Sequence, residues 1–207
     1  MKILVYGINY SPELTGIGKY SGEMANWLAT QGHEVRVVTA PPYYPDWKVW
    51  QGFSSWSFSK RQEAGVTVIR CPLYVPARPT AIKRLLHLAS FSISSAFAVF
   101  AQLRWKPDLV ILVVPTLFCA PQALALAKLT GAKSVLHIQD YEVDALFGLS
   151  IVKGDKLKRF AFAAERAVLR AFDRVSTISS GMLHRAAQKG VDNKQLRFFP
   201  NWSETAR

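Results

Sequence analysis

Short apolar runs alternate with amphipathic segments along almost the whole chain. The run at 2–9 predicts a first strand, buried on both faces of a parallel sheet. Apolar residues at helical spacing follow, Gly32 ends that helix, and Glu34 to Thr39 (EVRVVT) predicts a second strand. These segments together form a β-α-β unit.

The same alternation continues toward the carboxyl terminus. Further strands are predicted near Val66 and from Asp108, Lys133, Arg174 and Gln195, and helices over 83–104, 117–129, 155–172 and 181–189. Strands that alternate with helices predict an α/β fold, a Rossmann-like, doubly wound, mostly parallel sheet with helices on both faces. In such sheets ligands bind at the carboxyl ends of the strands.

Residues 41–65 interrupt this alternation and predict a long loop. The segment begins PPYYPDW and continues with Trp50, Phe53 and Trp56. Two interpretations stay open, because the aromatic side chains could pack over the sheet or form a surface for a substrate or partner.

The basic residues are unevenly spread. The chain of 207 residues has a formal net charge of +12, and segments 51–107 and 151–207 each carry an excess of seven basic groups. Such a field attracts a phosphorylated substrate, an anionic membrane or a nucleic acid. No nucleic-acid-binding module is recognisable, so no nucleic-acid partner is expected. The amino terminus does not resemble a signal peptide, which predicts a cytoplasmic protein. Cys71 and Cys119 lack the spacing of a disulfide framework or a zinc site, so two buried thiols are predicted.

The stretch ELTGIGKYSGE carries Gly16, Gly18 and Gly22 at the start of the first helix. A dinucleotide fingerprint needs its first glycine directly after the strand and an acidic residue at the end of the second strand, and neither is present. A nucleoside-triphosphate loop fails as well, because Tyr20 follows Lys19 where Ser or Thr is required. The glycines therefore predict either a close approach of the backbone to an anionic ligand or a tight entry into the helix.

A polar cluster, HIQDYEVD, follows a later strand at the same predicted edge. It contains His137, Gln139, Asp140, Glu142 and Asp144. Clustered carboxylates suit magnesium or calcium, but the glycine and distal glutamate of a calcium loop are lacking, so no metal site is predicted. The alternatives are a ligand site and simple solvation of a loop.

Four motifs in order, TGIGKYSGEMANWLATQGHEVRVVTAPPYYP, HIQDYE, STISSGM and FFPNWSE, resemble the amino-terminal half of family-four retaining glycosyltransferases with the GT-B architecture. Among these the chain is most similar to the colanic acid fucosyltransferases of exopolysaccharide synthesis. The resemblance implies that Gly16, Ile17 and Gly18 lie near the donor and that His137 and Asp140 are catalytic. It also implies a nucleotide-sugar donor such as GDP-fucose, a lipid-linked glycan acceptor, and no cofactor or metal.

The resemblance further implies the domain organisation. Residues 1–200 correspond to the acceptor-side domain and 201–207 to the start of an interdomain linker, while the donor-binding domain is absent. The chain alone is therefore expected to be inactive. The alternative is a non-catalytic, membrane-associated binding domain.

Two predicted helices bear on membrane association. On the helix 155–172, Lys156, Arg159, Arg166 and Arg170 share one face, whereas another face is apolar and consists of Leu157, Phe160, Ala161, Ala164 and Val168. The basic face predicts either a solvated surface or a peripheral contact with the anionic inner face of the plasma membrane, where an acceptor would be presented. The uncharged segment 85–103 predicts a helix inside the domain or at an interface rather than one that spans a bilayer.

Overall fold

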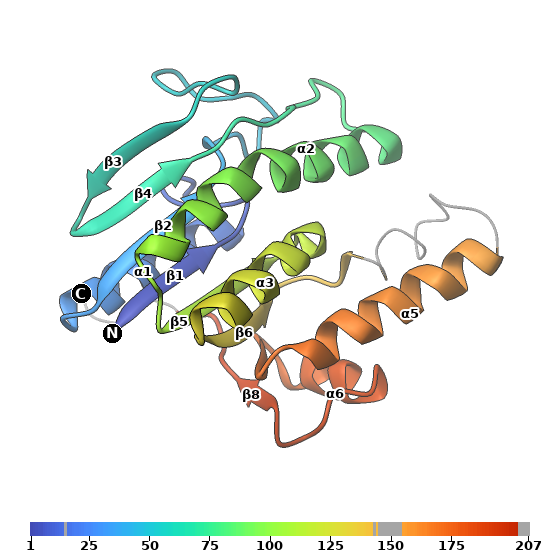
Figure 1. Cartoon of the computed structure of the whole chain (residues 1–207). Helices are drawn as coiled ribbons and strands as arrows, with labels where there is room; N and C mark the ends of the chain where they lie inside the picture. The colour runs from blue at the N-terminus through green and yellow to red at the C-terminus, as the bar shows by residue number, and fades with distance from the viewer. Residues whose placement is uncertain (15, 143, 145–154, 203–207) are drawn as a thin grey trace.

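The computed structural model describes residues 1–14, 16–142, 144 and 155–202 (Figure 1). Its strands are β1 (Lys2–Tyr6), β2 (Glu34–Thr39), β3 (Ser59–Glu63), β4 (Val66–Arg70), β5 (Leu109–Val114), β6 (Lys133–Ile138), β7 (Arg174–Thr177) and β8 (Leu196–Phe198). Its α-helices are α1 (Gly16–Thr30), α2 (Ala81–Phe100), α3 (Ala120–Thr130), α5 (Asp155–Ala171) and α6 (Ser180–Gln188). Two short 3-10 helices, η1 (Ala101–Arg104) and η2 (Leu117–Cys119), complete the described elements.

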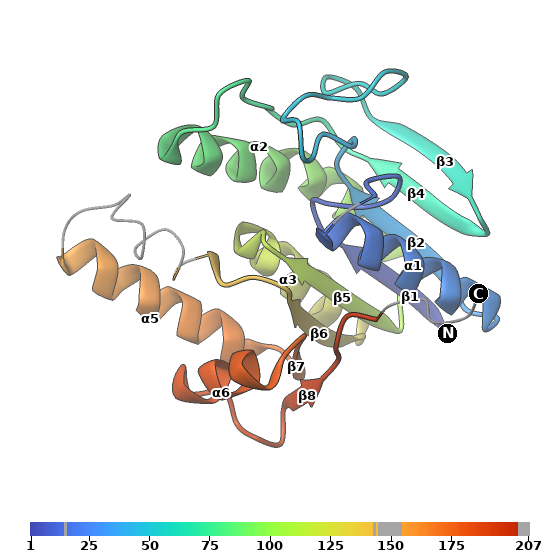
Figure 2. The same ribbon diagram turned by 180° about the vertical axis from the view of Figure 1, so that it is seen from behind.

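The strands form one sheet in the order β3-β4-β2-β1-β5-β6-β7-β8. Neighbouring strands are parallel except for β3 and β4, which pair antiparallel at one edge. Helix α1 lies on one face of the sheet and helices α2, α3 and α5 lie on the other (Figures 1 and 2). The predicted Rossmann-like, doubly wound α/β fold is confirmed.

Two cores follow from the alternation of side chains along the central strands. In β1, Leu4 and Tyr6 point to the face covered by α2, α3, α5 and α6, where they pack with Phe91 of α2. Ile3 and Val5 point to the opposite face, which α1 covers. Burial on both faces explains why these strands read as continuous apolar runs.

The predicted loop at 41–65 contains a strand that the sequence pattern did not indicate. Strand β3 reads SKRQE, with three of its residues exposed, so it has no apolar alternation to detect. Its place at the sheet edge explains the polar composition. Glu63 accepts two hydrogen bonds from the buried Arg70 guanidinium, at 2.6 and 3.1 Å, which fixes β3 to its neighbour β4.

Helix α2 begins at Ala81 after Thr80, whose hydroxyl accepts a hydrogen bond from the amide of Lys83. Together with η1 it is the one helix in the described part of the chain that is long and apolar enough to cross a membrane. One face of α2 is buried in the domain through residues such as Phe91 and Val99, as in a core helix of a globular fold. This placement agrees with the predicted helix inside the domain.

The apolar side chains predicted to share one face of α5 do not all point into the core. Phe160 is 71% exposed and Ala164 is exposed, whereas Glu165 and Leu169 are buried. The reason is a contact with Lys189, which directly follows α6. Lys189 forms a buried ion pair with Glu165, and this pairing allows the carboxylate to face the interior. Leu157 was also assigned to this face, but its side chain lies outside the described residues.

Candidate functional site

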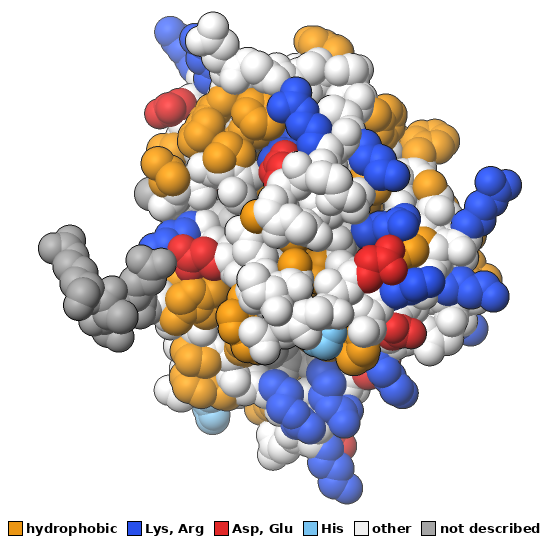
Figure 3. Space-filling model, turned by 90° about the vertical axis from the view of Figure 1, so that its left-hand side faces the viewer, with side chains coloured by type: hydrophobic (Ala, Val, Ile, Leu, Met, Phe, Trp, Pro, Cys, Tyr) orange, Lys and Arg blue, Asp and Glu red, His pale blue; other side chains and the backbone are white. Residues whose placement is uncertain are grey.

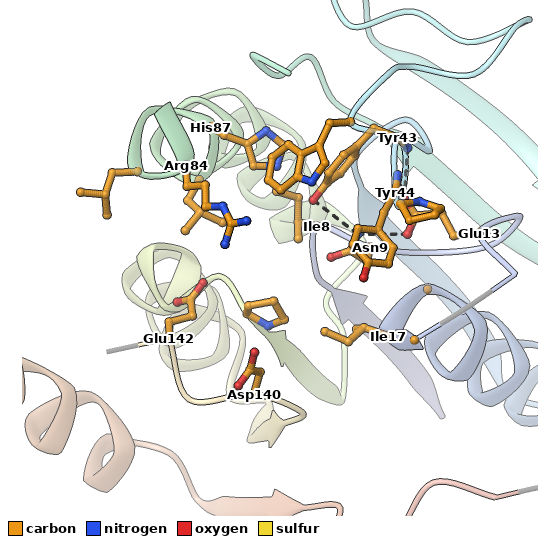
Figure 4. Close-up of a pocket in the computed structure, with 17 residues that line it drawn as sticks. Ile8, Asn9, Glu13, Ile17, Tyr43, Tyr44, Arg84, His87, Asp140 and Glu142 are labelled. Atoms are coloured by element: carbon orange, nitrogen blue, oxygen red, sulfur yellow. Dashed lines mark hydrogen bonds between the residues drawn. The ribbon is translucent and has the colours of Figure 1, made fainter. Parts of the chain in front are cut away.

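A pocket of about 540 Å³ opens at the carboxyl edge of the sheet (Figure 4). It is formed by the segments after β1, β2, β5 and β6 together with the first turns of α1 and α2. This is the position predicted for a ligand site in a doubly wound sheet. The residues that line it are Ile8, Asn9, Glu13, Gly16, Ile17, Gly18, Tyr43, Tyr44, Pro45, Trp47, Arg84, Leu85, His87, Leu88, Pro115, Asp140 and Glu142.

The glycine loop makes a tight entry into α1 and borders the pocket, whereas its predicted approach to an anionic ligand stays a prediction. Gly16 adopts a positive φ of 58°, which favours glycine, and begins α1 at the pocket wall with Ile17 and Gly18. A Cβ on Gly18 would lie 2.6 Å from Cβ and Oε2 of Glu13. One on Gly22 would lie 2.7 Å from Cβ of Ser11. Gly18 and Gly22 thus allow close packing of α1, while the residues 16–18 border the pocket.

Glu13 connects three walls of the pocket. Its carboxylate is buried and accepts hydrogen bonds from Asn9 Nδ2 and from the backbone amides of Tyr43 and Tyr44, each at 3.0 Å. Burial raises the pKa of Glu13, although these three donors oppose the shift. The glutamate therefore fixes the segment after β1 to the aromatic segment after β2.

Aromatic rings form the upper wall of the pocket in Figure 4. The ring of His87 lies 4.7 Å from Tyr43 and 5.2 Å from Trp47, measured between ring centroids. Arg84 stacks its guanidinium over Trp47 at 5.4 Å. This aromatic wall offers an apolar surface against which a ligand can pack, with a cation beside it. The aromatic loop at 41–65 therefore both packs within the domain and lines the pocket.

His87 is held in one tautomer. Its Nδ1 lies 2.6 Å from the carbonyl oxygen of Tyr74, and because a carbonyl oxygen only accepts, Nδ1 carries the proton. Nε2 is buried and has no hydrogen-bond partner among the described residues. Burial lowers the pKa of His87 to about 4, so the ring is neutral near pH 7.

Two carboxylates face this wall from the segment after β6. Asp140 is exposed, whereas Glu142 accepts a hydrogen bond from the amide of Leu117 at 2.8 Å through Oε2. The Oε1 atom of Glu142 is buried and has no partner among the described residues. Burial raises the pKa of Glu142 to about 7, and the carboxylate of Asp140 adds to the shift. Glu142 can therefore exchange a proton near neutral pH. Figure 4 shows its side chain just below that of Arg84.

Asp144 belongs to a different cluster from its neighbours in the sequence. It pairs with Arg185 of α6 at 3.1 Å and with Lys189 at 3.0 Å. Although partial burial would raise its pKa, these hydrogen bonds lower it. Within the described residues no three His, Cys, Asp or Glu side chains are grouped as a metal site would need. The prediction of a site without a metal stays a prediction.

His137 lies at the same sheet edge but is not one of the residues that line the pocket. It is 3% exposed, and its Nδ1 lies 2.9 Å from Ser176 Oγ. The ring of Phe199 packs against it at 5.3 Å, and Trp202 packs on Phe199 at 5.9 Å. Burial lowers the pKa of His137 to about 4. Of the two residues predicted as catalytic, the structure thus places Asp140 at the pocket and His137 beneath the segment that follows β8.

The basic side chains predicted on α5 lie on the outside of the molecule. Lys156, Arg159, Arg166 and Arg170 are exposed, and none lines the pocket. Arg170 also donates from Nε to the carbonyl oxygen of Gly190 at 2.8 Å, which ties it to the end of α6. Basic side chains are also numerous on the face drawn in Figure 3, with acidic side chains interspersed among them. The charge that the sequence showed is therefore a property of the surface.

Several pocket residues were not singled out from the sequence. One of them is Glu13, which lies in the predicted loop before the first helix. The others are Arg84 and His87, which lie in a predicted helix that is largely uncharged. The sequence did contain one indication of these residues. Arg84 and His87 are about one helical turn apart near the amino terminus of an apolar helix, so they lie on the same side of it. Tertiary structure is needed to bring that turn against the segment after β2.

The comparisons with known proteins identify the family. The model of the glycosyl transferase 4-like domain matches residues 15–202. The chain therefore belongs to the glycosyl transferase 4-like family. This membership favours a glycosyltransferase over the non-catalytic binding domain that the sequence left as an alternative.

Sequence and structure comparisons agree with this assignment. Over 210 residues the chain is 63% identical to WcaI of Escherichia coli (strain K12), whose name describes a candidate colanic acid biosynthesis glycosyl transferase. The match covers 100% of this chain and 51% of WcaI, so the chain spans about half the length of that curated relative.

The solved structures show the same fold. The match to sucrose-phosphate synthase from Thermosynechococcus elongatus covers 96% of this chain and 47% of the synthase chain, at a TM-score of 0.58 and 14% sequence identity. The match to a ugt transferase from Siraitia grosvenorii in complex with UDP covers 97% of this chain and 50% of the transferase chain, at a TM-score of 0.54 and 12% sequence identity. These neighbours are GT-B glycosyltransferases, and at such identities they establish the architecture alone.

Proposed function

We propose that this chain is the acceptor-side half of a retaining GT-B glycosyltransferase of colanic acid exopolysaccharide synthesis. In this proposal residues 1–200 form the acceptor-side domain, and a linker to a donor-binding domain begins at Asn201. The complete enzyme transfers a sugar from a nucleotide-sugar donor to a lipid-linked glycan, with fucose from GDP-fucose as the first candidate. Family membership and the 63% identity to WcaI support this function.

One observation carries the proposal most directly. The pocket at the carboxyl edge is bordered on one side by the glycine loop and on the other by Asp140 and Glu142. A transferase must bring the donor and the acceptor together at one edge, and the free amides at the start of α1 suit the negative charge of a nucleotide diphosphate. Gly16, Ile17 and Gly18 would then contact the donor, and the aromatic wall would hold the acceptor sugar.

The chemistry assigned to the chain's own residues needs no cofactor besides the donor. Asp140 is placed to accept a hydrogen bond from a sugar hydroxyl in the pocket. His137, which the family resemblance marks as catalytic, would need the segment around Phe199 to move before it could contact a ligand. We therefore assign Asp140 to the acceptor side and keep His137 as a proposed catalytic residue.

The proposed location is the cytoplasmic side of the inner membrane, where a lipid-linked acceptor would be presented. The exposed Lys156, Arg159 and Arg166 of α5 support a peripheral contact with anionic headgroups. Such contacts are weakened by salt, because exposed charges are screened.

A donor-dependent transfer assay tests the proposal. A full-length family protein that contains this sequence is incubated with a lipid-linked acceptor and either GDP-fucose or UDP-sugars. Transfer from one of these donors is expected, and His137→Ala should lower turnover by about tenfold or more if His137 contacts the reacting sugar. Absence of transfer from every nucleotide sugar would contradict the proposed function, whereas unchanged turnover in the variant would leave His137 a structural residue. The purified chain of 207 residues is expected to show no transfer, and detectable transfer would contradict the assignment as one half of the enzyme.

A further inference from the structure

Helix α2 carries large apolar side chains on its solvent side. Their exposed fractions range from 37% to 74%. We call these residues the α2 stripe: Ile82, Leu86, Ile93, Phe97 and Phe100. Surface helices of globular domains are normally polar on this side, so the stripe needs an explanation.

The spacing places the stripe on one line along the helix. Successive members are separated by 4, 7, 4 and 3 residues, and at 3.6 residues per turn they fall within about 60° of one another. From Ile82 to Phe100 the stripe is about 27 Å long. The opposite side of α2 carries Phe91, Ser95 and Ala98, which are buried in the domain. Helix α2 is therefore apolar on two opposite sides, one of which the described structure leaves uncovered.

The sequence segment that carries the stripe is positively charged. Between Glu63 and Asp108 the sequence contains no acidic residue. Lys83 near the amino end of α2 and Arg104 just past its carboxyl end are both exposed, as are Arg78 and Lys106 further out. An apolar line bounded at both ends by cations matches a bilayer surface, where acyl chains lie beneath anionic headgroups.

We propose that the α2 stripe docks the protein on an anionic bilayer, with α2 parallel to the membrane plane. The stripe enters the acyl boundary, and Lys83 and Arg104 contact the headgroups. The first turns of α2 also line the pocket through Arg84 and Leu88, so this docking brings the pocket wall next to the headgroup layer. The inference rests on the proposed function for the identity of the acceptor but not for lipid binding.

The buried side of α2 argues for this parallel orientation. Ser95 Oγ lies 2.6 Å from the hydroxyl of Tyr6 in the core, and His87 Nδ1 donates to the carbonyl of Tyr74. A helix that crossed the bilayer would have to leave these partners and expose both polar groups to hydrocarbon, which is costly.

A second copy of the chain is a poorer match for the stripe. In a two-fold interface the same patch meets itself, so the cations of one copy would face those of the other. Because the segment between Glu63 and Asp108 has no acidic residue, its own side chains cannot neutralise them. Anionic lipids supply that negative charge directly.

Vesicle co-sedimentation of the 207-residue chain tests the inference. The chain is expected to bind vesicles of phosphatidylethanolamine with phosphatidylglycerol and to bind phosphatidylcholine vesicles at least about tenfold more weakly. The double variant Ile93→Gln with Phe97→Gln should lower binding to the anionic vesicles by about tenfold or more, because two large apolar side chains no longer enter the bilayer. The matched control is Trp27→Gln, at a position of 61% exposure on α1, which covers the opposite face of the sheet, and it should stay within about twofold of the parent.

A charge-reversal arm separates the two contributions. Lys83→Glu with Arg104→Glu should weaken binding by about tenfold at low salt, whereas Lys194→Glu, in the loop before β8, should have little effect. Alkaline carbonate should release the bound chain, and retention of the chain would indicate a spanning helix and overturn the parallel orientation.

Three further results would overturn the inference. These are no binding to anionic vesicles, equal binding by the stripe variant, and a dimer in solution that the stripe variant converts to a monomer. The last result would assign the stripe to a second copy. Because no donor or acceptor is present in the vesicle assay, its failure would leave the proposed transferase activity untouched. Far-ultraviolet circular dichroism of each variant checks that the fold is intact.

Discussion

Glu142 makes the stability of the domain depend on pH, and Glu142→Gln should remove that dependence. In the folded chain burial raises the pKa of Glu142 to about 7, from an ordinary value of 4.5. Between these two values the folded state binds more protons than the unfolded state, so the free energy of unfolding falls as pH rises. The contribution of the protonated carboxyl is complete below about pH 4.5 and is lost as pH rises through about 7.

The magnitude follows from the two pKa values. Each pKa unit corresponds to about 1.4 kcal/mol, so the difference amounts to about 3 kcal/mol at full burial. The side chain borders the open pocket, and solvent there lowers the expected loss to about 2 kcal/mol between pH 5 and pH 8.5. In Glu142→Gln the side-chain oxygen can still accept the hydrogen bond from the backbone amide of Leu117. The uncharged NH2 group of the glutamine then takes the place of Oε1, which is buried and has no partner among the described residues.

Urea denaturation followed by tryptophan fluorescence measures this effect. The parent chain is expected to lose about 2 kcal/mol between pH 5 and pH 8.5 relative to Glu142→Gln. The contributions of His87 and His137 are common to both proteins and cancel in the comparison. Asp46→Asn, at an exposed position, is the matched control and should follow the parent. If the parent and Glu142→Gln show the same change with pH, the reasoning about burial of this carboxyl is wrong.

Two further predictions concern packing. Gly18→Ala should lower the free energy of unfolding by about 1 to 3 kcal/mol, because the added Cβ would meet Glu13 at 2.6 Å; Gly181→Ala in α6, with nothing within 4 Å, should be neutral or slightly stabilising. Equal effects of the two substitutions in urea denaturation would refute the close contact. Cys71 and Cys119 are buried, and burial raises the pKa of both thiols to about 12, so neither should react with iodoacetamide near pH 8 until urea unfolds the chain. Rapid labelling of the native chain, detected by mass spectrometry, would contradict this burial.

The order of strands and helices could be predicted because burial on both faces leaves a continuous apolar signal. The run DLVILVV corresponds to β5, whose residues Val110 to Val114 are all buried. β3 carries no such signal, since an edge strand with exposed side chains is held by pairing and by the contact between Glu63 and Arg70. Edge strands of this kind depend on their neighbour in the sheet, which a local pattern does not contain.

The location of the pocket was predictable, but its composition was only partly so. Parallel strands bring the segments after β1 and β6 to one edge, which explains why Gly16 and Asp140 both line the pocket. The wall formed by Trp47 and Arg84 depends on how α2 packs against the segment after β2, and residue spacing within either segment does not specify that packing. The burial of Glu165 was missed for the same reason, because its partner Lys189 lies 24 residues further along.

Helix α2 connects the two surfaces to which we assign a function. Its first turns contribute Arg84 and His87 to the pocket, while Ile82 and Leu86 in the same turns belong to the α2 stripe. Because His87 is fixed by its hydrogen bond to Tyr74 and by the neighbouring aromatic rings, these turns cannot rotate independently of the pocket wall. A bilayer bound to the stripe would therefore fix the orientation of the pocket as well as its distance from the membrane. For a lipid-linked acceptor, whose sugar protrudes from the headgroup layer, that fixed orientation lowers the entropy cost of reaching the site.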